Sequence, residues 1–344
     1  MLINHGSYAL FPGGFLGVDL FFIISGYLIS SMLWAEYDEH GGISLKNFYA
    51  RRILRLYPAL LICIILAIIL WSHTTLSETA SMPLATFAAL YYLANIVDEH
   101  VMGSLNHLWS LSVEEHFYLF WPPIILMTAK RSNRNRIIFL ICLIVIATII
   151  RIAASFHDGV WRHGIWTIDP YSFTLCRIDC ILIGALLYPL GRATRSYLLP
   201  DTKFAEKILL FFCFAFILYC CFTLRFADAW WQRGGFIATN CACVFIVIAA
   251  LRNSLHPIFE SKAMVWLGRR SYGIYIYHMP IYLVLEPLRI HHDNLNFILV
   301  LILRIALSIG IAALSYEFIE KPILRYKKIF QSRPRSSAPA QMTA

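Results

Sequence analysis

The chain has 344 residues, of which 59% are hydrophobic and only 14% are charged, whereas a soluble chain usually carries about a quarter of charged residues. Apolar runs close to the roughly 20 residues that a helix needs to cross a bilayer recur from end to end, which excludes a soluble protein with one buried core. The net charge of +9 does not indicate a nucleic-acid partner, because Lys and Arg gather in alternate loops, as the positive-inside bias of membrane proteins produces.

The predicted fold is an all-α membrane protein, a polytopic helical bundle of about nine spanning helices plus one re-entrant or interfacial segment. Helices are expected because every backbone polar group in lipid has to be satisfied within its own segment. The expected spans lie, in chain order, at about 15–34, 57–72, 108–129, 137–156, 174–191, 208–226, 235–251, 272–289 and 297–320.

The short apolar stretch 82–97 decides the predicted topology. If it does not cross the bilayer, all five basic clusters of the chain lie on one side, as the positive-inside rule requires. We therefore interpret it as re-entrant or interfacial, with the first residues outside and the C-terminus in the cytoplasm. Residues 1–328 are expected to form one membrane domain, and 329–344, rich in Ser, Pro and Ala, a disordered cytoplasmic tail. No metal site is predicted, because the nine cysteines show no CxxC or Cys/His spacing.

Two adjacent carboxylates, Glu114 and Glu115, lie near the start of the predicted helix 108–129. An ionisable residue inside a membrane helix is costly, so it is a candidate for function. Tyr118 shares a helix face with Glu114, while Glu115 points to a neighbouring face. Trp109, Ser112 and Tyr118 of the same segment are candidates for binding a donor or substrate. The alternative is an interfacial belt of Trp, His and Glu that lipid headgroups keep wet.

His5 and Asp19 flank the start of the first predicted span and are expected at the outer face, together with the acid pair. Asp19 is a further candidate for binding donor or substrate. A histidine beside a carboxylate can act as a general base on a hydroxyl group, because its pKa lies near neutrality. An exposed histidine near an N-terminus would seldom be functional by itself, and only the neighbouring polar residues favour the catalytic interpretation.

Arg177 and Asp179 lie two residues apart in another predicted span, so they face different ways and should have separate partners. A structural ion pair and a role in substrate binding both remain open for them. His278, a candidate for binding donor or substrate, belongs to a polar stripe on an otherwise apolar helix. Such a stripe indicates either a wet cavity or a hydrogen-bonded seam between helices. The members of that stripe are Ser271, Tyr275, His278, Tyr282, Glu286 and Arg289.

Arg52 and Arg55 lie three residues apart in the predicted first cytoplasmic loop, so they would share one face of a helix. Two guanidinium groups placed in this way could hold a phosphate group through paired hydrogen bonds. The alternative is an ordinary basic anchor at the cytoplasmic face.

Several of these segments closely resemble the acyltransferase 3 family of bacterial membrane enzymes. The resemblance runs in order over nearly the whole chain, and the combination of motifs is specific although any one alone would be weak. The segments that carry it are GGFLGVDLFFIISGYLIS (13–30), SLKNFYARRILRLYPAL (44–60), LWSLSVEEHFYLFWP (108–122), RIDCILIGALL (177–187), LGRRSYGIYIYHMPI (267–281) and SYEFIEKPI (315–323).

The resemblance implies that 1–328 is a membrane acyltransferase domain. His5 matches the proposed catalytic histidine of the family, and Glu114 and Glu115 match its paired acid. Arg52 and Arg55 match the cytoplasmic Arg-x-x-Arg that is thought to engage the donor. In one respect the chain departs from the family, which has an arginine on a helix preceding the histidine, whereas this sequence begins four residues before His5. A start codon placed too late is the favoured explanation, and a truncated, inactive protein is the alternative.

The resemblance further implies O-acyl transfer, here of acetyl, from cytoplasmic acyl-coenzyme A to a carbohydrate hydroxyl at the outer side of the bacterial inner membrane. Acyl-coenzyme A (acetyl-coenzyme A) would be a co-substrate, with no permanently bound cofactor. The expected partners are the lipid bilayer and a glycan or glycolipid acceptor such as lipopolysaccharide or exopolysaccharide, and the oligomeric state stays open. A transporter or flippase of a lipid-linked sugar is the rival, although the inverted repeats and broken helix pairs of such proteins are not found.

Overall fold

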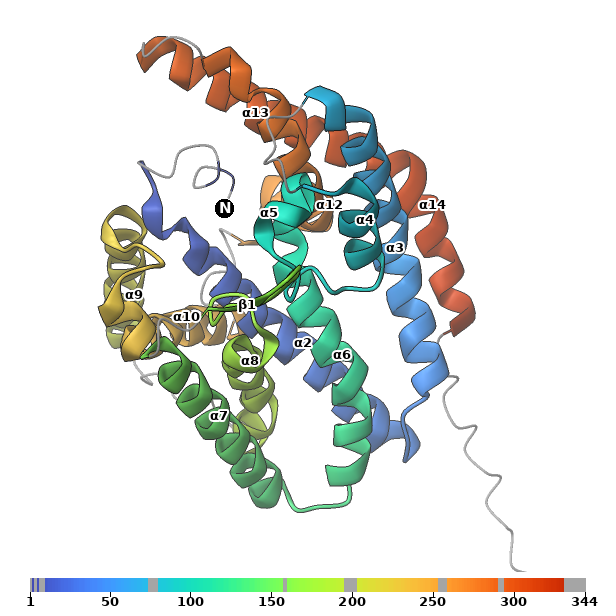
Figure 1. Cartoon of the computed structure of the whole chain (residues 1–344). Coiled ribbons are helices and arrows are strands. Elements are labelled where there is room, and N and C mark those ends of the chain that lie inside the picture. The colour runs from blue at the N-terminus through green and yellow to red at the C-terminus, as the bar shows by residue number, and fades with distance from the viewer. Residues whose placement is uncertain are drawn as a thin grey trace, which may run out of the picture.

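The computed structural model describes residues 2, 5, 10–73, 80–156, 160–194, 203–252, 259–289 and 294–330. These residues form a bundle of long helices with one small hairpin (Figure 1). The long helices are α2 (Leu16–His40), α3 (Leu45–Leu70), α6 (Trp109–Thr128), α7 (Asn133–Ser155), α8 (Thr174–Thr194), α9 (Lys203–Thr223), α10 (Phe236–Leu251), α12 (Lys262–Val284) and α13 (Asn294–Ser315).

Shorter elements connect and extend these helices. They are η1 (Pro12–Phe15), η2 (Trp71–His73), α4 (Met82–Leu90), α5 (Glu99–Met102), η3 (Gly103–Leu108), η4 (Trp231–Gly235), η5 (Glu286–Arg289), η6 (Tyr316–Glu320), α14 (Lys321–Leu324) and η7 (Arg325–Phe330). The hairpin consists of β1 (Trp161–His163) and β2 (Trp166–Ile168), which pair antiparallel with Trp161 opposite Ile168.

The predicted all-α membrane fold is confirmed. Seven helices in the described part of the chain are long and apolar enough to cross a bilayer, so the protein is a multi-pass membrane protein. Helices α6 and α12 have 20 and 23 residues as well, but their polar side chains lower their hydropathy. Each predicted span falls on one long helix. Helix α4 has only nine residues, about 14 Å, so the stretch 82–97 does not cross as one helix.

Several boundaries differ from the prediction, and the largest differences are at the starts of α3 and of α12, which begins at Lys262 rather than near 272. Helix α3 begins at Leu45 rather than near 57, because the Ser44 hydroxyl caps it by accepting the Asn47 backbone N–H at 3.4 Å. The expected loop that carries Arg52 and Arg55 is therefore helical. Of the predicted disordered tail, residues 329–330 lie in η7 and 331–344 lie outside the described residues.

The basic clusters lie at one end of the bundle. The Arg51 guanidinium, at the start of α3, donates to the Phe330 carbonyl at 2.6 Å, so this helix start meets the end of η7. The Asn133 amide, at the start of α7, donates to the Pro189 carbonyl near the end of α8 at 2.8 Å. Figure 1 shows the α2–α3 and α6–α7 turns at the same lower end of the bundle. This arrangement agrees with the single basic face that the sequence predicts.

Two apolar cores lie on either side of α6. The first packs α2, α6, α7 and α8 around residues such as Trp34 and Phe117. The second packs α3, α4 and α12 around residues such as Leu60 and Tyr277, and α6 contributes Leu111 to it. The boundary between the cores therefore follows α6, and the polar residues of that helix lie along this boundary.

Candidate active site

Four polar side chains follow one face of α6 and its entry: His107, Ser110, Glu114 and Tyr118. Their spacings of three, four and four residues place them one above another. The first and last are eleven residues apart, or roughly 17 Å at the rise of a helix. Of these four residues, the sequence analysis selected Glu114 and Tyr118 as site residues. The row connects the polar groups around Glu114 with a group of histidines that includes His107.

Glu114 accepts short hydrogen bonds from the hydroxyl groups of Ser25 and Tyr118. Its side chain is buried between α2 and α6. The bond from Tyr118 confirms the predicted shared face of these two residues. The sequence analysis did not select Ser25, and only its position as a hydroxyl residue within an apolar span could have indicated it.

Glu115 lies on the neighbouring face, where one of its carboxylate oxygens is buried without a hydrogen-bond partner among the described residues. The charges of Glu115 and Glu114 both act on the Arg52 guanidinium. That guanidinium stacks on the Tyr118 ring, with its central carbon 3.8 Å from the ring centroid. The acid pair therefore lies beside the Arg-x-x-Arg motif, whereas the sequence placed the two at opposite faces. The difference arises because Arg52 lies in α3 with its side chain pointing toward α6, where it contacts Tyr118.

Arg55 lies one turn further along α3 and is exposed. The charges of Arg52, Glu114 and Glu320 act on it. Neither Arg52 nor Arg55 forms a hydrogen bond or a close ion pair with a group in the described part of the chain. Their N–H donors are therefore available to an anionic ligand at the basic end of the bundle.

A cavity of about 430 Å³ opens where α2, α6 and α12 meet. This volume lies within the usual range for a small-molecule site of about 300–1,000 Å³. The wall is largely apolar, with a few polar groups that include Glu114 and Ser110 of α6 and Tyr275 of α12. The Ser110 and Tyr275 hydroxyl groups hydrogen-bond at 2.5 Å, and the Tyr275 hydroxyl donates to the His107 carbonyl at 2.7 Å. The cavity wall thus includes Glu114 and is linked through Tyr275 to the backbone of His107.

Three histidines, His5, His107 and His278, gather beyond this cavity. The Nδ1 atom of His5 lies 2.6 Å from Nε2 of His278, and their rings are nearly parallel. The His107 ring lies edge-on to the His278 ring at 5.1 Å. His5 therefore contacts another histidine rather than the carboxylate that the sequence analysis expected beside it. Burial lowers the pKa of His5 to about 4, so its imidazole is neutral at physiological pH.

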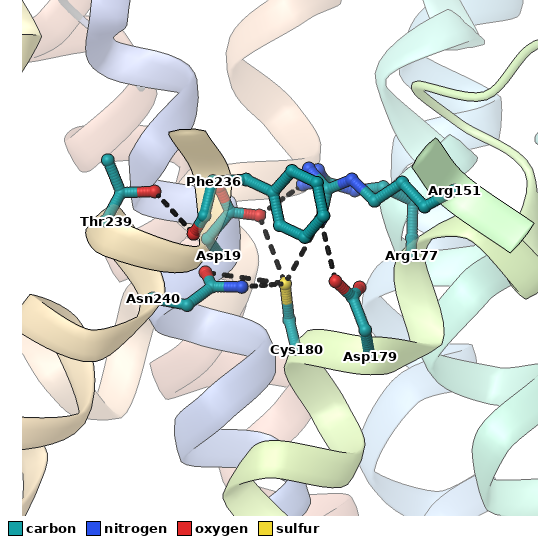
Figure 2. Close-up of polar contacts among 8 residues, drawn as sticks. All are labelled: Asp19, Arg151, Arg177, Asp179, Cys180, Phe236, Thr239 and Asn240. Atoms are coloured by element: carbon teal, nitrogen blue, oxygen red, sulfur yellow. Dashed lines mark hydrogen bonds and ion pairs between the residues drawn. The ribbon is translucent and has the colours of Figure 1, made fainter. Parts of the chain in front are cut away.

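A second polar cluster joins α2, α7, α8 and α10 (Figure 2), and none of the residues drawn there lines the cavity. Arg177 forms an ion pair with Asp19, and Arg151 forms one with Asp179 at 2.9 Å. Cys180 lies between the two pairs, donating its thiol to Asp19 at 3.5 Å and accepting from the Asn240 amide at 3.3 Å. The predicted separate partners of Arg177 and Asp179 are therefore confirmed.

The side chains of Asp19 and Arg177 are both fully buried. Aromatic rings surround the Arg177 guanidinium within 6 Å, including that of Trp109 at 5.8 Å. Neither Asp19 nor Arg177 is among the residues that line the cavity. Of the two interpretations that the sequence left open, the geometry favours a structural ion pair. Arg151 was not selected from the sequence, although an arginine in an apolar span is itself a signal.

Ser112 differs from the other predicted binding residues. Its hydroxyl donates to the Leu108 carbonyl one turn earlier, at 3.2 Å, and its side chain is 1% exposed. The hydroxyl group is therefore satisfied within α6. Trp109 is buried as well, with its ring 5.0 Å from that of Tyr171. Both residues contribute to packing around α6 rather than to the cavity wall.

The fold and this row of polar groups define a helical membrane protein with a largely apolar cavity whose wall includes Glu114, Ser110 and Tyr275. The family model described as an acyltransferase domain matches residues 2–316. The chain therefore belongs to the acyltransferase 3 family, which confirms the resemblance seen in its motifs.

Curated relatives match over 94% of the chain. It is 29% identical to the "Putative peptidoglycan O-acetyltransferase YrhL" of Bacillus subtilis over 338 residues, which cover 52% of that protein. It is 32% identical to the "O-acetyltransferase OatA" of Staphylococcus aureus over 341 residues, which cover 55% of that protein. The chain thus spans about half the length of the curated relatives that it matches. No solved structure matches it.

Proposed function

We propose that the protein transfers an acetyl group from acetyl-coenzyme A, supplied from the cytoplasm, to a carbohydrate hydroxyl at the outer side of the bacterial inner membrane. The observation that carries this proposal is the continuous row of polar groups along α6. It begins where Arg52 stacks on Tyr118, passes Glu114 and the cavity, and ends at the histidines. The names of the curated relatives favour an O-acetyltransferase over the transporter or flippase alternative.

The donor would enter at the basic end of the bundle. Arg52 and Arg55 would hold its phosphate groups through charge-assisted hydrogen bonds. The extended pantetheine arm reaches roughly 20 Å, while the row from Tyr118 to His107 spans roughly 17 Å. Phosphates held near Arg52 would therefore let the thioester reach the far end of the cavity, near the histidines.

His5 would act as the general base in a direct transfer. It takes the proton of the acceptor hydroxyl while that oxygen attacks the thioester carbonyl carbon. The C–S bond then breaks, and the departing thiolate of coenzyme A takes up a proton, so the products are an O-acetyl ester and free coenzyme A. Glu114 would hold the cavity end of the donor through its hydrogen-bonded carboxyl group, and Glu115 would balance the charge of Arg52.

Membrane vesicles that contain the full chain test this proposal. Radiolabelled acetyl-coenzyme A and oligomers of N-acetylglucosamine are supplied, and label in the oligomer that mild alkali releases is measured as ester. We expect transfer by the wild-type protein, less than about 1% of it in His5→Ala, and full transfer in the matched variant His40→Ala. Transfer that survives in His5→Ala removes His5 from the reaction. Wild-type protein that takes no label from acetyl-coenzyme A contradicts the proposed donor.

A further inference from the structure

His278 and His5 are in hydrogen-bonding contact, and the contacts of His278 determine which ring nitrogen of each residue carries the hydrogen. The Nδ1 atom of His278 lies in hydrogen-bonding contact with the Tyr275 carbonyl oxygen. A carbonyl oxygen can only accept, so Nδ1 of His278 carries the hydrogen. In a neutral imidazole the other nitrogen, Nε2, is then a bare acceptor. The protonation of His278 is thus defined by the backbone of its own helix.

The surroundings of His278 favour its neutral form. The side chain is fully buried in α12. The groups whose rings pack against it are His5, His107, Tyr275 and Tyr282, none of which is an anion. A buried charge without a counter-ion is costly, so the ring stays neutral and Nε2 keeps its lone pair.

The hydrogen on His5 follows from this. Nδ1 of His5 lies 2.6 Å from the bare Nε2 of His278, and one of the two atoms has to donate. Since Nε2 of His278 carries no hydrogen, Nδ1 of His5 is the donor. Nε2 of His5 is then left bare, and a bare imidazole nitrogen is what a general base requires.

We propose that His278 is the positioning residue that holds His5 as its Nδ1–H tautomer and so presents Nε2 of His5 to the hydroxyl of the acceptor. The inference rests on the proposed function for the role of His5 as the base. It gives His278 a task other than the donor or substrate binding predicted from the sequence. The Tyr275 carbonyl takes the place that a carboxylate occupies in other catalytic relays.

The test combines kinetics with nitrogen NMR of the full chain in detergent. His278→Phe keeps a buried ring but removes the acceptor, whereas His278→Gln retains an amide oxygen near the position of Nε2. In protein labelled with ¹⁵N-histidine, and with His5→Ala to assign the signal, His5 should show a bare Nε2 in the wild type. It should show a mixture of both tautomers in His278→Phe, and a bare Nε2 again in His278→Gln.

In the vesicle assay, His278→Phe should lower kcat at least about tenfold while KM for acetyl-coenzyme A changes less than about twofold, since positioning a base affects the chemical step. His278→Gln should recover part of kcat. Tyr282→Phe, which packs against the same ring, should leave both constants unchanged and serves as the packing control.

Two outcomes would overturn the inference: an unchanged His5 tautomer in His278→Phe, or wild-type kcat in that variant. The failure of the proposed function would look different, because His5→Ala would then keep its activity whatever the NMR signal shows. If His278→Phe does not fold, the test uses His278→Gln, with Tyr282→Phe as its control. The tautomer of His5 and kcat are then compared between these two variants. A His5 ring that carries its hydrogen on Nε2 in both His278→Gln and the wild type would contradict the inference.

Discussion

The guanidinium of Arg52 stacks 3.8 Å from the centroid of the Tyr118 ring, across the boundary between α3 and α6. The hydroxyl of the same tyrosine donates to Glu114, one turn earlier in α6. Tyr118 therefore contacts Arg52 with its ring and Glu114 with its hydroxyl group. A change at either part of this side chain should affect a different contact.

Tyr118→Phe keeps the ring under Arg52 but removes the hydrogen bond to Glu114. A hydrogen bond to a charged group contributes about 1.5–3 kcal/mol, so acetyl transfer should fall roughly tenfold or more. The vesicle assay measures kcat/KM for acetyl-coenzyme A. Tyr57→Phe is the matched control, because its hydroxyl donates only to the Leu90 carbonyl, at 3.1 Å. Equal rates for Tyr118→Phe and Tyr57→Phe would show that the Glu114 contact has no part in transfer.

Arg52→Lys tests the stacked contact instead. Lysine keeps the positive charge but lacks the planar group that stacks on a ring and binds a phosphate through paired hydrogen bonds. We expect KM for acetyl-coenzyme A to rise about tenfold, the loss of roughly one charged hydrogen bond, with a smaller change in kcat. Lys46→Arg, at the start of the same helix, should leave KM unchanged. A KM for Arg52→Lys equal to that of the wild type would place the donor phosphates elsewhere.

The buried pair of Asp19 and Arg177 should matter for stability rather than for donor affinity. Asp19→Asn leaves the Arg177 charge buried without its partner, which costs about 3–5 kcal/mol. The thermal midpoint of unfolding in detergent should fall, and Asp19→Asn/Arg177→Gln should recover part of the loss. Arg162→Gln, at a pair whose arginine is 57% exposed, is the control and should change little. An unchanged midpoint in Asp19→Asn would mean that the pair does not stabilise the bundle.

The long helices and much of this site could be predicted from the sequence, because lipid permits few alternatives for an apolar run. The shared face of Glu114 and Tyr118 followed from helical spacing alone. The bond from Ser25 to Glu114 joins residues 89 positions apart, and no local pattern indicates such a contact. The early start of α3 was missed because hydropathy detects its apolar part and not its polar first turns, which the Ser44 cap stabilises.

The close contact of α2 and α8 depends on two glycines. A Cβ atom at Gly26 would lie 1.9 Å from the Ile181 carbonyl oxygen, and one at Gly184 would lie 2.0 Å from the Ile23 carbonyl oxygen. Such small residues let membrane helices approach closely. The Asp19–Arg177 ion pair joins the same two helices, about two turns before Gly26 in α2.

Gly26→Ala should therefore force the two helices apart. Overpacking costs about 1–3 kcal/mol, and here the obstacle is a backbone atom that cannot move alone, so we expect the upper end of this range or more. Folded yield and the thermal midpoint in detergent measure the effect. Gly310→Ala in α13 is the matched control, because no atom lies within 4 Å of the added Cβ. Wild-type stability of Gly26→Ala would show that α2 and α8 are not held at this distance.

The pH profile of transfer should report the burial of His5. A solvent-exposed histidine base loses activity as pH falls through about 6.5. Burial lowers the pKa of His5 to about 4, so its base form persists at lower pH and activity should fall only as pH approaches about 4. Because the unfolded chain takes up the proton near pH 6.5, stability should already decline as pH falls from about 6.5 to about 4. Among the described residues, the titratable side chains near it are His278 of α12 and His107 of η3. We expect a flat kcat between about pH 5.5 and 7.5, measured in vesicles with intrinsic fluorescence to verify folding. A rising limb centred near pH 6.5 in folded protein would mean that the base is an exposed histidine.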